Sequence, residues 1–302
     1  MAAEANGQES GRMDGQIGSR IEKVGVIGGG LMGSGIAEVT AKAGIDTVVV
    51  EVSQEAADAA RTRIGASLER ALSRGKIDQA EHDAIRGRIT VATELEALAD
   101  RDLVVEAASE REDIKLDLFR RLGTILDNDE AILASNTSSI PIVKLGAVSG
   151  RADRVMGVHF FNPAPVMQLV ELIPSLTTSP ATLTRMQDFV SHSLGKQPIE
   201  ATDRAGFVVN SLLVPYLLSA IRMYEAGYAS ATDIDQGMVL GCGHPMGPLA
   251  LSDLIGLDTI RAIGVSMYEE FKEPLYSPPP LLDRMVDAGL LGKKSGQGFY
   301  PY

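Results

Sequence analysis

Short apolar runs alternate with amphipathic segments along the first two thirds of the chain. Runs of apolar residues bounded by polar or glycine positions predict buried strands, and apolar residues recurring every three or four positions predict helices. The predicted strands cover 23–28, 46–51, 89–93, 102–108 and 131–137. The predicted helices cover 31–44, 54–88 with a break near Gly75, and 110–122. This alternation predicts an α/β domain whose mostly parallel sheet carries helices on both faces.

The pattern changes after residue 203. From about 206 to 291 the apolar spacing is helical, with breaks at 241–248 and 273–280. We therefore predict two domains: an α/β domain over 21–203 and an all-helical C-terminal domain over 204–302. A chain of 302 residues with 45% hydrophobic and 23% charged residues is long enough to bury two cores of this size.

Two segments raise the question of targeting or membrane insertion. The most apolar stretch, 205–221, is short and is interrupted by Asn210 and Pro215, so a buried helix is favoured over a membrane span. Residues 1–20 mix acids with bases and have no apolar core, which predicts a disordered tail rather than a secretory signal or a transit peptide. No membrane partner is expected.

Charge and cysteine content exclude other classes of function. The net charge of −12 argues against nucleic-acid binding, which needs a broad basic face. The single cysteine, Cys242, excludes an internal disulfide and a cysteine-built zinc site, and it fits a reducing, cytoplasmic location. The four histidines have no metal-ligand spacing, so no metal is expected, and His82 and His192 are predicted on helix surfaces.

The stretch VGVIGGGLMGSGIAEV carries a glycine pattern with a known physical purpose. Gly28, Gly30 and Gly33 have the G-x-G-x-x-G spacing between a predicted strand and a helix, which lets a pyrophosphate approach the backbone at the helix N-terminus. Glu51, at the end of the next strand, can accept hydrogen bonds from a ribose and repel a 2′-phosphate. A plain strand–helix turn would not need this acid, so the context predicts a Rossmann-type domain that binds NAD rather than NADP.

A histidine and a glutamate stand in two further predicted strands, HFF and QLVEL, joined by NPAPVM. A hairpin of these strands would bring His159 beside Glu171. An ionisable residue is costly to bury without a partner. The residues alone leave two interpretations of His159 open, a hydrogen-bonded core histidine or a group that does chemistry.

Seven stretches together are similar to one enzyme family. They are GVIGGGLMGSGIAEV, VVEAASE, ASNTSSIP, HFFNPAPVMQLVEL, GFVVNSLLVPYL, HPMGPLALSDLIGLDT and GKKSGQGFY. They resemble the 3-hydroxyacyl-CoA dehydrogenases, and most closely the stand-alone bacterial 3-hydroxybutyryl-CoA dehydrogenases, from about residue 21 to the C-terminus. The resemblance implies NAD-dependent hydride transfer on an acyl-CoA thioester, in a cleft between the NAD-binding domain and a helical domain that forms a homodimer.

The resemblance also implies roles for individual residues. The catalytic residues it implies are His159, Glu171, Ser138 and Asn210. The cofactor contacts it implies, besides the three glycines and Glu51, are Leu31, Met32, Glu110, Lys115, Asn162 and Lys294. The substrate contacts it implies are Ser67, Arg74 and Ser138. The sequence departs from the family at Glu51, where aspartate is usual; glutamate keeps the charge and has a longer reach.

Two other functions were weighed against this one. A dehydrogenase of free 3-hydroxy acids or sugar acids shares the helical-domain layout, but those enzymes use a lysine-based chemistry that nothing here matches. A non-catalytic NAD-binding or structural relative is the second alternative. The intact set of Ser138, His159, Glu171 and Asn210 argues against a loss of activity.

An acyl-CoA ligand carries phosphates, whereas the chain is acidic overall. Residues 56–76 carry a local net positive charge, with five basic residues against two acidic ones. Arg63, Ser67, Arg70 and Arg74 are spaced by 4, 3 and 4 and therefore share one helical stripe. The stripe is either a solvated basic face or the CoA site that the resemblance places at Ser67 and Arg74.

Overall fold

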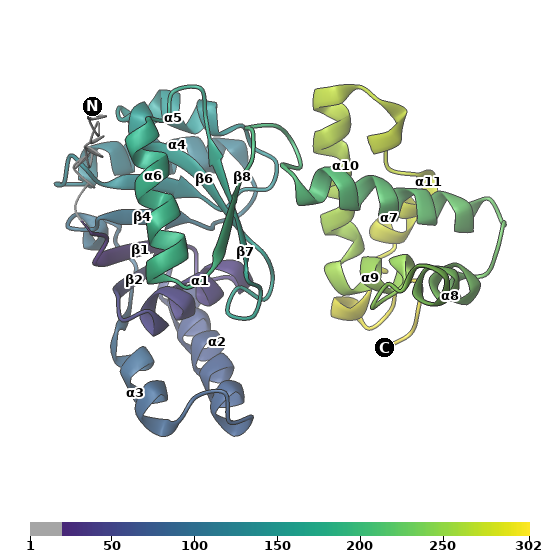
Figure 1. The fold of residues 1–302 in the computed structure, drawn as a ribbon, viewed down its shortest axis with the longest axis horizontal. Coiled ribbons are helices and arrows are strands. Elements are labelled where there is room, and N and C mark those ends of the chain that lie inside the picture. The colour runs from purple at the N-terminus through teal and green to yellow at the C-terminus, as the bar shows by residue number, and fades with distance from the viewer. Residues whose placement is uncertain (1–19) are drawn as a thin grey trace, which may run out of the picture.

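The computed structural model describes residues 20–302 and divides them into a sheet-containing body and a helical body (Figure 1). The predicted disordered tail, apart from Arg20, lies outside the described residues. The sheet body holds every named strand of the described chain, and the helical body begins after the last of them. The predicted fold class, a mostly parallel Rossmann-type sheet followed by an all-helical part, is confirmed.

One eight-stranded sheet forms the core of the first body. Its strands are β1 (Lys23–Ile27), β2 (Asp46–Val50), β3 (Ile89–Ala92), β4 (Leu103–Glu106), β5 (Ile132–Ser135), β6 (Val155–Phe160), β7 (Leu169–Pro174) and β8 (Gln197–Glu200). They lie in the order β3-β2-β1-β4-β5-β6-β7-β8, and only the β6–β7 pair is antiparallel. The order reverses between β1 and β4, which is where open sheets of this type bind ligands.

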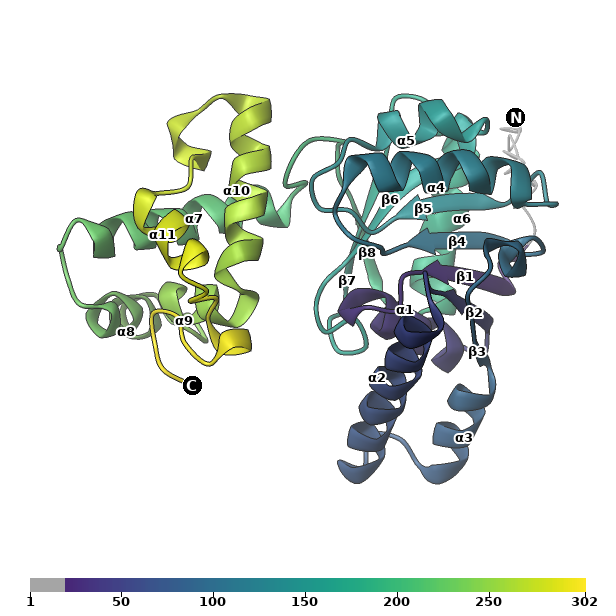
Figure 2. The ribbon, with the colours of Figure 1, turned by 180° about the vertical axis from the view of Figure 1, so that it is seen from behind.

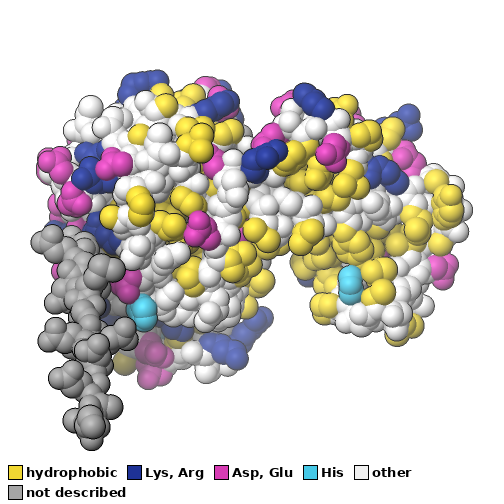
Figure 3. Space-filling model, turned by 45° about the horizontal axis from the view of Figure 1, so that its top comes forward, with side chains coloured by type: hydrophobic (Ala, Val, Ile, Leu, Met, Phe, Trp, Pro, Cys, Tyr) yellow, Lys and Arg dark blue, Asp and Glu magenta, His cyan; other side chains and the backbone are white. Residues whose placement is uncertain are grey.

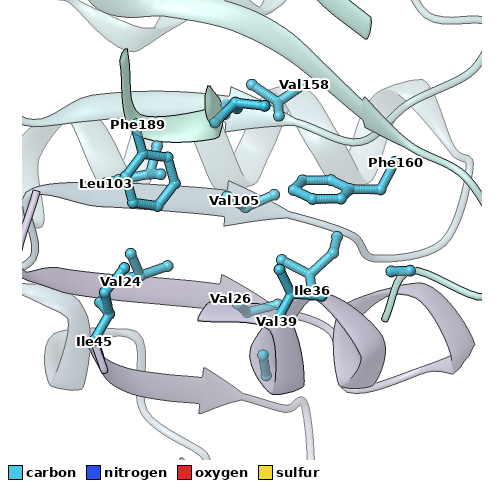
Figure 4. Packing of buried hydrophobic residues seen from close by; sticks show 14 of the residues in the cluster. Val24, Val26, Ile36, Val39, Ile45, Leu103, Val105, Val158, Phe160 and Phe189 are labelled. Carbon is cyan, nitrogen blue, oxygen red and sulfur yellow. The ribbon is translucent and has the colours of Figure 1, made fainter. Parts of the chain in front are cut away.

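Helices cover both faces of the sheet, as the alternation predicts. They are α1 (Leu31–Lys42), α4 (Glu112–Ile125), α5 (Ile142–Ser149) and α6 (Pro180–Asp188). Helices α1 and α6 pack on one face, and α4 and α5 pack on the other (Figures 1 and 2). Figure 4 shows the first face, where Ile36 and Val39 of α1 lie against apolar side chains of β1 and β4. This packing fixes the N-terminus of α1 over the switch point.

Helices α2 (Gln54–Ser73) and α3 (Gln79–Gly87) form a hairpin that extends away from the sheet body (Figure 2). The predicted break lies at Gly75, which has a φ of +63° that favours glycine. Asp78 and Glu81 then form a capping box that starts α3. The inner face of α2 is buried, and its outer face is polar.

His82 on α3 corrects a prediction. It is only 4% exposed, because α3 packs against α2 and brings Glu69 Oε1 within 3.4 Å of its Nε2 atom, while Asp83 Oδ1 lies 2.9 Å from Nδ1. The periodicity of one helix does not reveal the neighbour that covers it. The side chain of His192, in contrast, is 79% exposed, as predicted.

The second body is a bundle of five helices within the described chain. They are α7 (Val209–Glu225), α8 (Ala231–Cys242), α9 (Pro248–Ile255), α10 (Leu257–Phe271) and α11 (Pro280–Asp287). Their own apolar core is separate from the two cores that flank the sheet. The stretch around Pro215 is part of α7, a helix with one buried face, and in residues 20–302 no helix is long and apolar enough to cross a membrane.

Candidate active site

The hairpin of β6 and β7 places His159 directly opposite Glu171. The Nδ1 atom of His159 lies 2.7 Å from Oε2 of Glu171, and both residues are buried. Cross-strand neighbours on one face of an antiparallel pair point the same way, so the strand register alone creates this contact. An ionised carboxylate at this distance accepts a hydrogen bond from Nδ1–H and leaves the lone pair of the neutral ring on Nε2.

The other ring nitrogen of His159 meets Ser138. Its Nε2 atom lies 3.2 Å from Ser138 Oγ. Ser138 follows β5 at the carboxyl edge of the sheet, where open α/β sheets bind ligands. The rings of Phe161 and Phe207 contact the imidazole edge-on, at centroid distances of 4.7 Å and 5.5 Å. The imidazole is therefore fixed in orientation, with its basic nitrogen beside a hydroxyl group.

The start of the helical body completes the surroundings of Glu171. Its Oε1 atom accepts hydrogen bonds from the backbone N–H groups of Val208, at 3.0 Å, and Val209, at 2.9 Å. These are the first amides of α7, and helix N-termini favour negative charge. Asn210 follows in the same turn and is buried. Both bodies of the protein therefore contribute to one site.

Glu110 connects the loop after β4 to the loop that carries Ser138. Its Oε1 atom accepts hydrogen bonds from the Thr137 hydroxyl, from Ser138 N at 3.0 Å and from Ser139 Oγ at 2.9 Å. Burial alone would raise the pKa of the Glu110 carboxyl, but the Lys115 ammonium and these hydrogen bonds hold it below its ordinary value. Glu110 is thus ionised at neutral pH and orders the serine loop.

Lys115 lies inside the domain rather than at its surface. Its Nζ atom is 2.7 Å and 2.8 Å from the two carboxylate oxygens of Glu106 and 3.3 Å from Glu110 Oε2. Glu106, at the end of β4, also accepts a hydrogen bond from Ser135 Oγ at 2.6 Å. Glu106 was not predicted as a site residue, although an acid at the end of an apolar strand, as in VVEAASE, indicates a buried ion pair.

The glycine loop has the shape that a dinucleotide requires. A Cβ atom at Gly33 would lie 1.7 Å from the Gly28 carbonyl oxygen, so glycine is needed for the close approach of α1 to β1. A Cβ atom at Gly30 would meet nothing within 4 Å, which leaves open space before the N-terminus of α1, where Leu31 and Met32 begin the helix. A pyrophosphate fits there.

Glu51 lies beside this loop, directly after β2. Its Oε1 atom accepts a hydrogen bond from Gly29 N at 2.6 Å. Arg63 of α2 donates to the carbonyl oxygen of the same glycine. Arg63, although it shares a helical stripe with Arg74, is therefore bound to the glycine loop.

The remaining predicted cofactor contacts lie on separate parts of the fold. Asn162 is exposed and precedes Pro163 across a cis peptide bond, just beyond β6. Lys294 belongs to the helical body and forms an ion pair with Asp258. Within residues 20–302, none of the recorded hydrogen bonds or ion pairs joins Lys294 to the glycine loop.

A cavity of about 970 Å³ lies between α1, α2 and the β6–β7 connection. Two of the three predicted substrate contacts, Ser67 and Arg74, line it. The charged residues that line it with Arg74 are Glu38, Lys42, Arg70, Lys76 and Lys196. Lys42, Lys196 and Glu38 come from other elements and were not found from the sequence. The cavity is thus a basic site within an acidic protein.

A sheet domain that accepts a dinucleotide and presents a histidine near the carboxyl ends of its strands is typical of nicotinamide-dependent oxidoreductases. Two family models match this chain: the NAD binding domain of 3-hydroxyacyl-CoA dehydrogenase over residues 23–204, and the C-terminal domain of the same family over residues 206–302. The chain belongs to the 3-hydroxyacyl-CoA dehydrogenase family. The predicted family and the NAD cofactor are confirmed.

Curated relatives and solved structures agree with this assignment. A 3-hydroxybutyryl-CoA dehydrogenase of Mycobacterium tuberculosis is 55% identical over 282 residues, which cover 93% of this chain and 99% of the relative. The human mitochondrial hydroxyacyl-coenzyme A dehydrogenase is 42% identical, with 93% of this chain and 91% of the relative covered. The crystal structure of an (S)-3-hydroxybutyryl-CoA dehydrogenase from Ralstonia eutropha matches with a TM-score of 0.88 at 44% identity, covering 93% of this chain and 99% of that one.

Proposed function

We propose that this protein catalyses the NAD-dependent oxidation of (3S)-3-hydroxybutyryl-CoA, and of related 3-hydroxyacyl-CoA thioesters, to 3-ketoacyl-CoA, together with the reverse reduction. The observation that carries the proposal is the position of His159 between the Glu171 carboxylate and the Ser138 hydroxyl. Such a group can take a proton from, or return it to, the oxygen on a carbon that loses or gains hydride.

At the glycine loop, bound NAD would supply the hydride acceptor for C3 of the substrate. His159 Nε2 takes the proton of the 3-hydroxyl group, and in the reduction the protonated ring returns it. Glu171 holds Nδ1–H and stabilises the imidazolium that forms. Ser138 and Asn210 donate hydrogen bonds to the reacting oxygen. The contact between His159 Nδ1 and Glu171 Oε2 supports the proton transfer, and the contact between His159 Nε2 and Ser138 Oγ supports the role of Ser138.

Cofactor binding is assigned to the glycine loop and to residues around it. The proposed contacts are Gly28, Gly30, Leu31, Met32, Gly33, Glu51, Glu110, Lys115, Asn162 and Lys294. Asn162 lies in the same body as the glycine loop, whereas Lys294 lies in the helical body, so a cofactor that contacts both would be bound by both bodies. Glu110 touches the serine loop directly, which supports a link between the cofactor site and Ser138.

Replacement of Glu51 by serine tests the ribose assignment. The wild type is expected to prefer NADH, because the carboxylate repels the 2′-phosphate of NADPH. In E51S the ratio of kcat/KM for NADH over NADPH should fall by roughly tenfold or more, since like-charge repulsion is worth several kcal/mol and Arg63 lies beside the same loop. A wild type that prefers NADPH would show that Glu51 does not face the ribose.

The cavity beside α2 is proposed to bind the phosphates of CoA, through Ser67 and Arg74. Arg74→Glu should raise KM for acetoacetyl-CoA by about tenfold or more and leave KM for NADH unchanged, because one attractive charge becomes repulsive. The wild-type KM for the thioester should also rise with salt. Arg120→Glu, on the exposed side of α4, is the matched control. Unchanged constants in R74E would place the phosphates elsewhere.

The helical body is proposed to form a homodimer. It exposes several large apolar side chains, among them Leu212 (74% exposed), Tyr228 (82%) and Leu240 (81%), and Figure 3 shows apolar side chains gathered on this body. Apolar surface of this kind marks interaction sites.

A cytoplasmic location is also proposed for this protein, and the single, unpaired Cys242 supports it.

The stereochemistry of the substrate tests the proposed reaction. NAD reduction should be measured with (3S)- and (3R)-3-hydroxybutyryl-CoA at equal concentrations. We expect rapid turnover of the 3S isomer and little of the 3R isomer, because the fixed histidine that takes the proton and the fixed site of the hydride acceptor fit only one configuration at C3. Equal rates with both isomers, or turnover of neither, would contradict the proposal.

A further inference from the structure

Lys196 is a buried cation that directly precedes β8. The residue is only 5% exposed, whereas most lysines keep their ammonium group in water. Its Nζ atom donates hydrogen bonds to the carbonyl oxygens of Ala164, at 2.9 Å, and Met167, at 2.6 Å. Both carbonyls belong to the connection between β6 and β7, so Lys196 ties this connection to the far edge of the sheet.

The connection held by Lys196 borders two proposed binding regions. It begins at Phe161, whose ring contacts that of His159, and its Pro163, Pro165 and Val166 line the basic cavity. On the opposite side it packs on α1: a Cβ atom at Gly35 would lie 3.1 Å from Ala164 Cβ. The connection is therefore held between α1 and the Lys196 ammonium.

The charge of Lys196 has no negative partner among the ion pairs of residues 20–302. Burial lowers the pKa of its ammonium, and the neighbouring base Lys42 lowers it further. A buried charge is costly unless it is paired. Two of the three N–H groups of the ammonium are taken by carbonyls, and the residue lines the cavity together with Arg70 and Arg74.

We propose that the third N–H of Lys196 binds a phosphate oxygen of the CoA moiety. The inference rests on the proposed function, which supplies the phosphorylated ligand. The phosphate supplies the negative charge that Lys196 lacks among the ion pairs of the described residues. The same ammonium group, through its bonds to two carbonyls, holds the β6–β7 connection beside the bound substrate. Lys196 is thereby a substrate-binding residue in addition to Ser67 and Arg74.

The test compares two substrates that share the reacting thioester and differ in the 3′-phospho-ADP moiety, which carries all the phosphates of CoA. Wild type and Lys196→Met are assayed with acetoacetyl-CoA and with acetoacetyl-pantetheine, which has the same thioester and no phosphate. K196M should lose about 10- to 100-fold more kcat/KM with the CoA thioester than with the pantetheine thioester, as expected for a lost charge-assisted hydrogen bond. Titration calorimetry with adenosine 3′,5′-bisphosphate should show weaker binding to K196M by a similar factor.

Controls separate this role from a purely structural one. Equal losses with both thioesters, and unchanged binding of the bisphosphate, would overturn the proposal and leave Lys196 as a loop tether. Lys196→Gln keeps an N–H donor for the loop without the charge; it replaces K196M if that variant does not fold, and the same difference is expected. Lys144→Met, at an exposed ion pair on α5, should behave as wild type. A wild type inactive on acetoacetyl-CoA would refute the proposed function, whereas the calorimetric result would still decide the role of Lys196.

Discussion

Replacing His159 with glutamine is expected to lower kcat by about 10²–10⁴, the usual loss when a general acid or base is removed. Glutamine is uncharged and cannot accept the proton that leaves the 3-hydroxyl group. NADH binding should be nearly unchanged, because the imidazole contacts Glu171 and Ser138 rather than the glycine loop. Steady-state kinetics with acetoacetyl-CoA and fluorescence titration with NADH measure the two quantities.

The control for this variant is His192→Gln, because His192 lies on the surface far along the chain from β6. It should retain wild-type kcat and wild-type NADH affinity. Turnover close to wild type in H159Q would show that His159 is a core residue, the alternative that the sequence by itself leaves open. A parallel loss of NADH binding would instead indicate damage to the whole domain.

The Glu171→Gln variant should have a kcat lower than wild type by a factor on the order of 10²–10⁴, although glutamine and glutamate side chains have nearly the same volume. The amides of Val208 and Val209 donate to one oxygen of Glu171, so the carbonyl of the new side chain takes that place. Its NH₂ group then faces His159 Nδ1 and donates to it. The neutral ring must carry its proton on Nε2, the wrong tautomer for a base, as in the corresponding change in serine proteases.

The matched control is Glu200→Gln, an exposed glutamate on β8, the strand that pairs with β7. It should leave both kcat and KM unchanged. An E171Q enzyme that keeps wild-type kcat would show that Glu171 does not set the tautomer, and the pair would then be structural. Circular dichroism of both variants verifies that the fold is retained.

Much of the fold and part of the site follow from the sequence. The strand and helix alternation predicts the sheet body, and the two apolar runs around NPAPVM predict the hairpin that pairs His159 with Glu171. The glycine spacing and Glu51 predict the cofactor loop. The structure shows why position 33 needs glycine, since a Cβ atom there would clash with the Gly28 carbonyl oxygen. These features depend on residues that are close together in the sequence, so short stretches are enough to predict them.

Features made by distant contacts were not predictable in this way. The amides that bind Glu171 come from the backbone of α7, which has no residue-type signal. Arg63 lies on the same stripe as Arg74 but reaches the glycine loop instead, because α2 packs beside it. His82 is covered by a second helix, and Lys196 meets its carbonyls only after β6, β7 and β8 pair. Each of these depends on packing between separate elements.

The central claim, that a His–Glu pair acts on an acyl-CoA thioester, is tested most directly by substrate choice. The measurement is kcat/KM of the wild type for acetoacetyl-CoA and for free acetoacetate, with saturating NADH. Binding energy from the CoA moiety, remote from the reacting carbon, contributes to catalysis, so the thioester should be favoured by several orders of magnitude. Equal values, or a preference for free acetoacetate, would contradict the account and favour a dehydrogenase of free hydroxy acids.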